Sequence, residues 1–581
     1  MKADTENKYI RIRIAVIAVF FGISFLIIGV RAFYLQVFRN TDMSERAAKE
    51  YIKVLKSYGK RGSIYDTAGR EMAVSIDAES VAVYPPRIKD PEAVAEALER
   101  ELKIDGNELI RHIESGRRFI WGKRCISSKE AAALRLLRLP GIDFIPEHSR
   151  FYPNRGLASQ AVGFTGTENR GLEGIEFFYD SELQGGTRED TVFKDALGRI
   201  FARNSKKEFE TETKVFSGRN LVLTIDSTVQ FITERALEEA ATEFSAKSGI
   251  AAVMDPETGA ILGLAHFPSF NPNSFSQFDK ELWRNKAVTD AFEPGSTMKI
   301  FIAAAAIESG KFKGSDVFYC EKGKYRIGED IVHDTSPYGR LTLENIIKFS
   351  SNIGAVKVAE QLGPELVYKT LCNFGFGEKT EIDCPGETAG SLSSYRRWSK
   401  IDAGTIAFGQ GLSVSVIQLL RAVCVIANGG ILMKPYIVRA ITDTNHARVA
   451  KIEPSRVRRV ISEETSQVVK SMMRGVLEEG GTGTAAALKG YTACGKTGTA
   501  QKINENGEYA KGRYISSFVG FAPEQNPRAA IAVILNEPQT DHYGGVVAAP
   551  AFRKIAQEIL NYLNVPVERK TGPGKLTACL R

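Results

Sequence analysis

The chain has 581 residues, of which 43% are hydrophobic and 25% are charged, a composition typical of folded globular protein. Because this length exceeds what one ordinary hydrophobic core supports, several domains are expected. The net charge of +8 is small for this size, and no folded segment carries a dense Lys/Arg stripe interleaved with aromatic residues, so a nucleic-acid partner is not expected.

The N-terminal region is predicted to cross a membrane once. No charged residue interrupts the apolar run from Ile14 to Val30, and adjoining residues extend it to a predicted helix over residues 14–36. Basic residues precede this helix at Lys2, Lys8, Arg11 and Arg13. By the positive-inside rule, residues 1–13 form a cytoplasmic tail on a cell (inner) membrane, and the remainder of the chain is periplasmic or otherwise extracytoplasmic. A cleaved signal peptide is the alternative, although the run exceeds a typical h-region of about 7 to 15 residues.

Residues 45–215 are predicted to form a membrane-proximal pedestal domain. Residues 61–70 predict a strand followed by a turn, and residues 90–102 predict an amphipathic helix with Asp90 as its N-cap. A second helix is expected between Ser127 and Pro140. No catalytic constellation is found in this part of the sequence, which favours a spacer or docking module.

A change to buried-strand character at residues 221–226, followed by a helix beginning at Ser227, predicts a second domain over residues 216–565. Two hairpins and a closing amphipathic helix are expected in it: strands 250–255 with 260–266, strands 517–522 with 529–535, and a helix over 550–563. Strands at both ends of a helix-rich stretch favour an α+β fold, in which helices flank an antiparallel sheet and a helical subdomain is inserted. Residues 566–581 have little apolar content and are predicted to be a flexible tail.

Cysteine and histidine spacing gives no indication of a metal site. The seven cysteines are scattered singly without C-x-x-C, and the six histidines lack the H-E-x-x-H spacing of zinc ligands. Neither a metal nor another cofactor is therefore expected. A disulfide between Cys372 and Cys384, the two cysteines closest in sequence, is left open as an alternative to free thiols.

Three short motifs carry the chemistry. Ser296 and Lys299 form an S-x-x-K pattern, which places a hydroxyl and an amine on one face of a helix and so pairs a nucleophile with a base. Taken alone this is a weak signal, because a capping serine and a surface lysine give the same pattern. Ser350-Ser351-Asn352 and Lys496-Thr497-Gly498-Thr499 follow in the order and at roughly the distances of the S-x-x-K, S-D-N and K-T-G set of penicillin-binding proteins and class A β-lactamases.

The chain resembles the class B penicillin-binding proteins, and most closely the FtsI-type septal peptidoglycan D,D-transpeptidases. The resemblance covers roughly residues 14–565 and includes further segments: Arg61-Gly62-x-Ile64-x-Asp66, Gly171-x-x-Gly174-x-Glu176, Asp255-Pro256-x-x-Gly259, Glu293-Pro294-Gly295-Ser296 and Gly409-Gln410-Gly411. It implies a penicillin-recognising transpeptidase fold after a transmembrane helix and a pedestal (dimerisation) domain.

The resemblance also implies roles for four residues of the first two motifs. Ser296 would be the nucleophile, and Lys299 would be its base. Lys299 can act only when neutral, so burial and the neighbouring Lys496 must lower its pKa well below the usual ~10.4. Ser350 would relay a proton to the leaving amine, and Asn352 would bind the substrate backbone.

The third motif is expected to bind the donor peptide. Lys496 would supply fixed positive charge, and Thr497 and Thr499 would bind the terminal carboxylate. Gly498, without a side chain, would let an extended substrate pair along the strand edge. The backbone N–H groups of Ser296 and Thr499 would form the oxyanion hole.

The implied reaction is cross-linking of peptidoglycan stem peptides through an acyl-enzyme during septal cell-wall synthesis and cell division. β-Lactams would acylate the same serine. Expected partners are a membrane-embedded glycan polymerase and other division proteins. The alternatives are an elongation-specific class B transpeptidase, a carboxypeptidase or β-lactamase that transfers the acyl group to water, a β-lactam sensor, and a non-catalytic scaffold for the polymerase.

Overall fold

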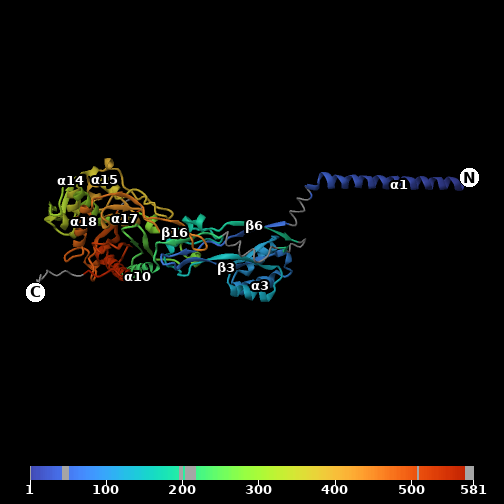
Figure 1. Cartoon of the computed structure of the whole chain (residues 1–581), viewed down its shortest axis with the longest axis horizontal. Coiled ribbons are helices and arrows are strands. Elements are labelled where there is room, and N and C mark those ends of the chain that lie inside the picture. Colours follow the sequence, from blue (N-terminus) through green and yellow to red (C-terminus); the bar gives the residue numbers. More distant parts are fainter. Residues whose placement is uncertain are drawn as a thin grey trace, which may run out of the picture. The chain divides into compact units, whose positions relative to one another are not determined.

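The computed structural model describes residues 2–41, 43, 52–194, 200–202, 217–504, 506 and 509–568 (Figure 1). The chain divides into two compact units, Met1–Lys60 with Gly185–Ser217, and Arg61–Gln184 with Gly218–Arg581. The predicted tail over residues 566–581 lies outside the described residues from residue 569 onward, as does the start of the predicted pedestal domain, residues 45–51.

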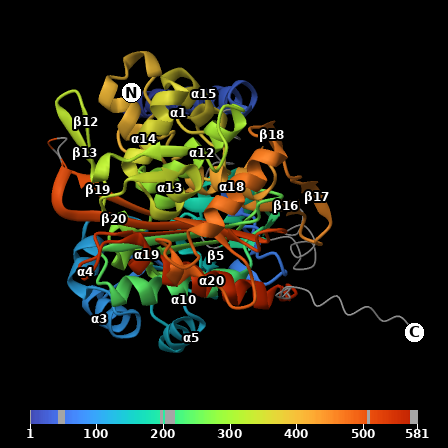
Figure 2. The same ribbon diagram turned by 90° about the vertical axis from the view of Figure 1, so that its left-hand side faces the viewer.

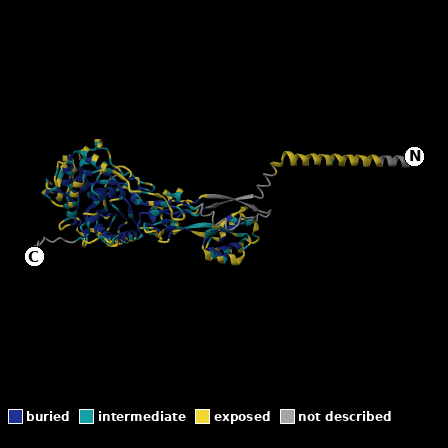
Figure 3. Cartoon of the chain, viewed as in Figure 1, coloured by how far each residue is buried: buried dark blue, intermediate teal, exposed yellow. Residues whose placement is uncertain are grey.

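The first unit contains the N-terminal helix. Helix α1 (Lys2–Phe33) continues into a π-helical turn over Tyr34–Phe38, and the section Ile10–Phe38 is long and apolar enough to cross a membrane. The side chains of this section are exposed, as Figure 3 shows, which those of an apolar helix in a water-soluble core would not be. The unit also contains an antiparallel sheet of β1 (Ile52–Tyr58), β6 (Thr187–Lys194) and β7 (Ile200–Ala202).

The pedestal part of the second unit contains a helical lobe packed on strands. The predicted helix over 90–102 is confirmed as α3 (Pro91–Leu102). It begins there because the Asp90 side chain caps it by accepting the N–H of Ala93. The second predicted helix is α5 (Ser128–Leu137), capped by Ser127. The other elements of this part are β2 (Ile64–Tyr65), β3 (Glu71–Val83), α4 (Gly106–Glu114), β4 (Ile120–Ile126), β5 (Ile142–Phe151), α6 (Ser159–Val162), α7 (Gly174–Phe178) and α8 (Asp180–Leu183).

A buried ionic cluster joins the two pedestal segments on which the resemblance rests. Arg61 forms ion pairs with Glu176 at 2.7 Å and with Asp180 at 2.6 Å, and Arg150 bonds the other oxygen of Glu176 at 2.6 Å. The side chains of Arg61 and Glu176 are completely buried. Because an unpaired charge could not be buried in this way, each member depends on the others.

One sheet links the pedestal to the rest of the second unit. Its strand order is β17-β16-β8-β2-β3-β4, with β5 also paired to β3. Strand β8 (Asn220–Leu223) runs parallel to β2 and antiparallel to β16 (Val438–Thr442), beside which lies β17 (Arg448–Lys451). The prediction of a strand to residue 226 was too long, because Asp226 is the N-cap of the next helix, α10 (Ser227–Glu243).

The predicted antiparallel sheet is confirmed as five strands in the order β10-β9-β21-β20-β19, and every neighbouring pair is antiparallel. Both predicted hairpins lie in it. Its strands are β9 (Ser248–Met254), β10 (Ile261–Phe267), β19 (Cys494–Ile503), β20 (Tyr509–Ala522) and β21 (Ala529–Asn536). Helices cover both of its faces (Figure 2), with α10 and α20 (Ala549–Tyr562) on one side and α17 (Val416–Ala427) and α18 (Glu463–Gly475) on the other. The α+β fold class is therefore confirmed, and β19 is an edge strand.

The inserted subdomain is built around α12 (Lys299–Glu308), whose first eight residues are all buried. A helix that is apolar on every side must lie inside the protein, so its first residue, Lys299, is buried with it. The remaining elements of this unit are α11 (Lys286–Thr289), β11 (Val317–Tyr319), β12 (Lys324–Ile327), β13 (Asp330–His333), β14 (Arg340–Thr342), α13 (Leu343–Phe349), α14 (Asn352–Leu362), α15 (Pro364–Asn373), α16 (Lys400–Ala407), β15 (Ile431–Met433), β18 (Arg456–Arg459) and α19 (Gly544–Val547).

Candidate active site

The Ser296 turn rests against the edge of the five-stranded sheet. Ser296 lies in a 3₁₀ turn, Gly295–Met298, that leads directly into α12 at Lys299. A Cβ atom added to Gly498 of β19 would lie 2.2 Å from Ser517 Oγ and 2.9 Å from Thr297 Cγ2. Gly498 therefore lets the turn approach the strand, so its lack of a side chain has a packing reason beyond the predicted access for substrate.

The Gly409-Gln410-Gly411 segment supports the same turn from another side. The N–H of Gly295 donates to Gly409 O at 3.1 Å, and the N–H of Gly411 donates to Glu293 Oε1 at 2.8 Å. The residues just before the predicted nucleophile are thus held by hydrogen bonds to this segment, while Ser296 itself is half-buried.

Lys299 joins the first motif to the second. Its amine is buried and donates to Ser350 O at 2.5 Å, to Asn352 Oδ1 at 2.7 Å and to Ser350 Oγ at 3.3 Å. Among the described residues, no hydrogen bond joins this amine to Ser296 Oγ. Hydrogen bonds between catalytic groups are often long until substrate binds. The prediction that Lys299 is the base for Ser296 therefore stands.

Lys496 joins the third motif to the second. Its amine donates to Ser350 Oγ at 2.9 Å and also contacts Thr497 O at 3.2 Å and Thr497 Oγ1 at 3.3 Å. Ser350 follows the last residue of α13 and has a left-handed backbone, with φ +60°. This conformation ends the helix and places Ser350 Oγ between the amines of Lys299 and Lys496, so the three motifs converge.

Both amines have lowered pKa values. Burial lowers the pKa of Lys299 to about 7, although the carboxylate of Asp334 acts in the opposite direction. Burial and the neighbouring Lys299 lower the pKa of Lys496 well below its ordinary value. This differs from the prediction of a fixed positive charge at Lys496. Within the part of the chain that the structure describes, the hydrogen-bond partners of its amine are uncharged oxygens, so its charge depends on what binds beside it.

The backbone of Thr499 faces the nucleophile turn. A Cβ atom added to Gly295 would lie 2.9 Å from Thr499 O, so this carbonyl points from β19 toward the turn and away from β20. In an antiparallel strand the N–H and C=O of one residue point to the same side, so the Thr499 N–H also faces the turn. The side chain of Thr499 accepts the N–H of Gly544 at 3.2 Å. The oxyanion hole of Ser296 and Thr499 stays a prediction that this geometry supports.

Three residues beyond the sequence motifs also shape the site. The hydroxyls of Thr482 and Thr497 are 2.9 Å apart. His333 O accepts the side-chain N–H of Asn352 at 2.9 Å, and Asp334 accepts hydrogen bonds from the segment around Asn352. No motif contains Thr482, His333 or Asp334, and only their three-dimensional positions identify them.

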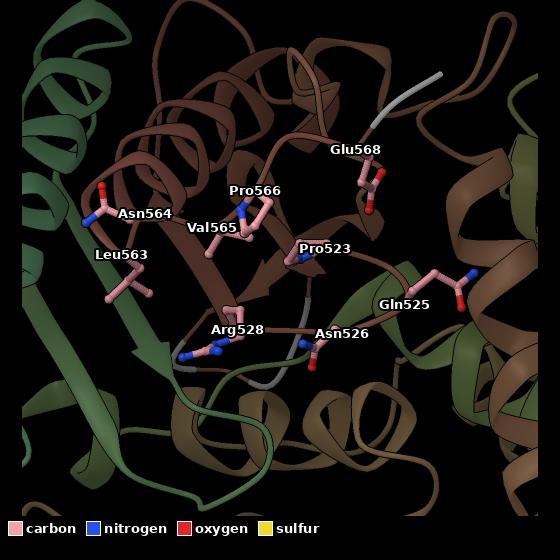
Figure 4. Close-up of a pocket in the computed structure, with 9 residues that line it drawn as sticks. All are labelled: Pro523, Gln525, Asn526, Arg528, Leu563, Asn564, Val565, Pro566 and Glu568. Carbon is pink, nitrogen blue, oxygen red and sulfur yellow. The ribbon is translucent and has the colours of Figure 1, made fainter. Parts of the chain in front are cut away.

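Two other features lie apart from these motifs. A hollow of about 310 Å³ is lined by the turn after β20 and the chain after α20, including Pro523, Arg528 and Val565 (Figure 4), and it contains none of the predicted site residues. Cys372 and Cys384 are free thiols, so the disulfide left open by the sequence is not formed.

Comparison with known proteins agrees with this arrangement. Residues 249–557 match the penicillin binding protein transpeptidase domain, and residues 56–223 match the penicillin-binding protein dimerisation domain. The chain is 33% identical over 570 residues to the probable peptidoglycan D,D-transpeptidase PenA of Neisseria meningitidis, covering 97% of this chain and 94% of that protein. It is 33% identical over 549 residues to the peptidoglycan D,D-transpeptidase FtsI of Escherichia coli, covering 93% and 90%.

Two further likenesses extend the comparison. Stage V sporulation protein D of Bacillus subtilis is 34% identical over 569 residues, which cover 96% of this chain and 87% of that protein. The crystal structure of penicillin binding protein 3 from Mycobacterium tuberculosis, complexed with aztreonam, has a TM-score of 0.69 at 27% identity and covers 89% of this chain and 98% of that one.

The chain belongs to the penicillin-binding proteins, as a class B member that joins a dimerisation domain to a transpeptidase domain. The predicted activity, that of a serine-type D-Ala-D-Ala transpeptidase acting on peptidoglycan, is confirmed at the level of the enzyme class.

Proposed function

We propose that this transpeptidase cross-links stem peptides at the division septum, with Ser296 as the acylated nucleophile. Support for the septal role comes from the similarity to FtsI. The observation that carries the catalytic proposal is the convergence of Lys299 and Lys496 on Ser350 Oγ, beside the Ser296 turn.

Acylation begins with the neutral amine of Lys299, which accepts the proton of Ser296 Oγ as this oxygen attacks the carbonyl carbon of the D-Ala-D-Ala bond. The negative charge on the former carbonyl oxygen is stabilised by the backbone N–H groups of Ser296 and Thr499. The C–N bond then breaks. A proton passes through Ser350 Oγ to the leaving amine of D-Ala, and the peptide stays bound to Ser296 as an ester.

The terminal carboxylate of the donor peptide determines which of the two lysines is protonated. It binds beside Lys496, Thr497 and Thr499, and its negative charge raises the pKa of Lys496, so that this amine becomes protonated. A protonated Lys496 in turn favours the neutral form of the nearby Lys299. Substrate binding thus keeps the base neutral at the moment when it is needed.

Deacylation uses an amine of a neighbouring stem peptide, whose attack on the ester forms the cross-link and releases Ser296. Asn352 holds the peptide backbone, and Gly498 leaves the edge of β19 open to an extended substrate. β-Lactams enter the same route at the first step and acylate Ser296.

Labelling with a fluorescent penicillin, followed by peptide mapping, tests the proposed nucleophile. The full-length protein is expected to carry one label on the peptide containing Ser296, and Ser296→Ala is expected to carry none. The exposed Ser455 provides a matched control, since Ser455→Ala should label like the wild type. A label that persists in Ser296→Ala would reject the assignment.

The septal role needs a separate test in cells. Depletion of the protein is expected to block division and produce filaments, and a fluorescent fusion is expected at midcell. Loss of rod shape without filaments would instead identify the elongation-specific alternative. Complementation by Ser296→Ala would identify the scaffold alternative, in which the chain recruits a membrane-embedded glycan polymerase without catalysis.

We also propose the topology and domain boundaries predicted from the sequence: a cytoplasmic tail over 1–13, a membrane helix over 14–36, a pedestal over 45–215 and an extracytoplasmic transpeptidase domain over 216–565. Arg11 and Arg13, which precede the apolar run, support this orientation. Cysteine labelling with a membrane-impermeant reagent tests it. An added cysteine at Glu238 should react in intact spheroplasts, and one at Thr5 only after lysis.

A further inference from the structure

A carboxylate from outside the three motifs holds the second motif in place. Asp334 follows β13, and its Oδ2 accepts the hydroxyl of Ser351 at 2.6 Å. Its Oδ1 accepts the backbone N–H groups of Asn352 at 2.5 Å and Ile353 at 3.1 Å. Ser351 is the N-cap of α14 and accepts the N–H of Gly354 at 2.9 Å. Asp334 and Ser351 together therefore satisfy the first three N–H groups of α14, which have no partner within the helix.

The same hairpin end orients the side chain of Asn352. His333 O accepts the Nδ2–H group of Asn352 at 2.9 Å, so the other side-chain atom, Oδ1, is directed to Lys299 Nζ at 2.7 Å. Asp334 is itself fixed, because its N–H donates to Gly323 O at 3.2 Å. The β12–β13 hairpin thus determines where Asn352 Oδ1 and the adjacent Ser350 oxygens lie around the Lys299 amine.

The charges around this amine come from two elements. Asp334 of the hairpin favours the protonated form of Lys299, and Lys496 of β19 is the second amine of the site, whose pKa burial and Lys299 lower. On the other side of Asp334, burial raises the pKa of the Cys320 thiol, which stays neutral, and Lys357 is paired with Glu321 at 3.1 Å. Asp334 is therefore the carboxylate whose charge acts on Lys299.

We propose that Asp334 is a positioning residue of the transpeptidase site, and that it supplies from the β12–β13 hairpin the carboxylate that the S-D-N form of the motif carries at its middle position. Here that position is Ser351, whose hydroxyl donates to Asp334. The carboxylate holds Ser350 and Asn352 against Lys299 and acts on the charge of this amine. This inference rests on the proposed role of Lys299 as the base.

The first test is the rate of penicillin acylation as a function of pH for the full-length protein and Asp334→Asn. The rate should rise as Lys299 loses its proton. Asp334→Asn keeps one acceptor oxygen but loses the acceptor for Ser351, so the maximal rate should fall about tenfold or more, since small displacements of catalytic groups have large effects. Without the carboxylate charge, Lys299 binds its proton less tightly, so the midpoint of the acid limb should move to lower pH.

The second test is rescue by exchange of the two groups. In Ser351→Asp/Asp334→Asn, the carboxylate stands at the S-D-N position, where Asp is also a good N-cap, and the amide introduced at position 334 can donate to it. Ser351→Asp alone places two carboxylates side by side and should acylate poorly. The double variant should be faster than either single variant, and its acid limb should return toward the wild-type pH. Asp330→Asn, on the exposed part of the same hairpin, should match the wild type.

Thermal unfolding of each variant shows whether it is folded at the assay temperature. The proposal would be overturned if Asp334→Asn acylated at the wild-type rate with the wild-type pH profile, or if the midpoint of its acid limb did not move. It would also be overturned if the double variant acylated no faster than the single variants. Failure of the underlying proposal looks different, because wild-type labelling would then survive Ser296→Ala, or the wild-type rate would show no acid limb.

Discussion

Ser350 Oγ accepts a hydrogen bond from Lys496 Nζ at 2.9 Å, and the same oxygen lies 3.3 Å from Lys299 Nζ. One hydroxyl is therefore the shared partner of two buried amines from two different motifs. This hydroxyl therefore connects the proposed base to the amine of the third motif, as a proton relay requires.

Removal of this hydroxyl should stop proton relay while leaving the fold intact. Ser350→Ala is expected to lower the rate of penicillin acylation by about 10²-fold to 10⁴-fold, the usual contribution of a positioned proton-transfer group. Rapid-mixing fluorescence measures this rate. Ser455→Ala is the control, and a Ser350→Ala rate within a factor of two of the control would contradict the relay.

Gly498 is expected to tolerate no side chain. In Gly498→Ala the added methyl group would lie 2.2 Å from Ser517 Oγ and 2.9 Å from Thr297 Cγ2, which forces the Ser296 turn away from β19. Such overpacking should destabilise the protein by about 1–3 kcal/mol and abolish most acylation. Thermal unfolding and penicillin labelling measure the two effects. Gly475→Ala, at the end of α18 with no atom within 4 Å of the added methyl group, should behave as wild type.

The buried pedestal cluster should be far more sensitive than an exposed ion pair. Glu176→Gln leaves the buried Arg61 and Arg150 without their shared carboxylate, so a loss of about 3–5 kcal/mol in the free energy of unfolding is expected. The exposed pair of Arg219 and Glu182 gives the comparison, since Glu182→Gln should change stability by at most about 1 kcal/mol. Denaturant unfolding of the full-length protein in detergent measures both, and equal losses would contradict the prediction.

Glu234 should make stability depend on pH. It accepts the N–H of Ala158 at 2.8 Å and the side chain of Gln230 at 2.7 Å, and burial raises its pKa to about 7 from an ordinary 4.5. The folded protein holds this proton more tightly than the unfolded chain, so the stability contribution is complete below pH 4.5 and is lost as pH rises through 7.

The matching experiment is Glu234→Gln, which removes the ionisable group and keeps an acceptor oxygen. It is expected to raise the free energy of unfolding by about 1–3 kcal/mol at pH 8 and to leave it nearly unchanged at pH 4. Melting temperatures at the two pH values measure this difference. Glu243→Gln, an exposed change on the same helix, is the control, and a Glu234→Gln variant that gains nothing at pH 8 would show that the pKa of Glu234 is not raised in the native protein.

Much of the fold could be predicted because its signals are local. Asp90 caps α3, Ser127 caps α5, and the alternation of apolar strands with turn residues marks the hairpins of β9 with β10 and β20 with β21. The motif residues could also be predicted, since their order along the chain is characteristic of the family.

Features that depend on contacts through space could not be predicted. Asp334 is one acidic residue in a short hairpin, and nothing local connects it to Ser351 or Lys299. The sequence suggested one neutral and one charged lysine, but it could not show that both amines share Ser350 Oγ, nor that the contacts of Lys496 are to uncharged oxygens. The placement of β8 beside β2 likewise depends on residues more than a hundred positions apart.

That placement has a practical consequence for anyone dissecting the protein. A fragment begun at residue 216 would keep β8 but lose β2, its parallel neighbour, and would leave a row of unsatisfied backbone groups facing water. Such a truncation should self-associate, whereas one begun at Arg61 would keep the strand and its partner in the same polypeptide.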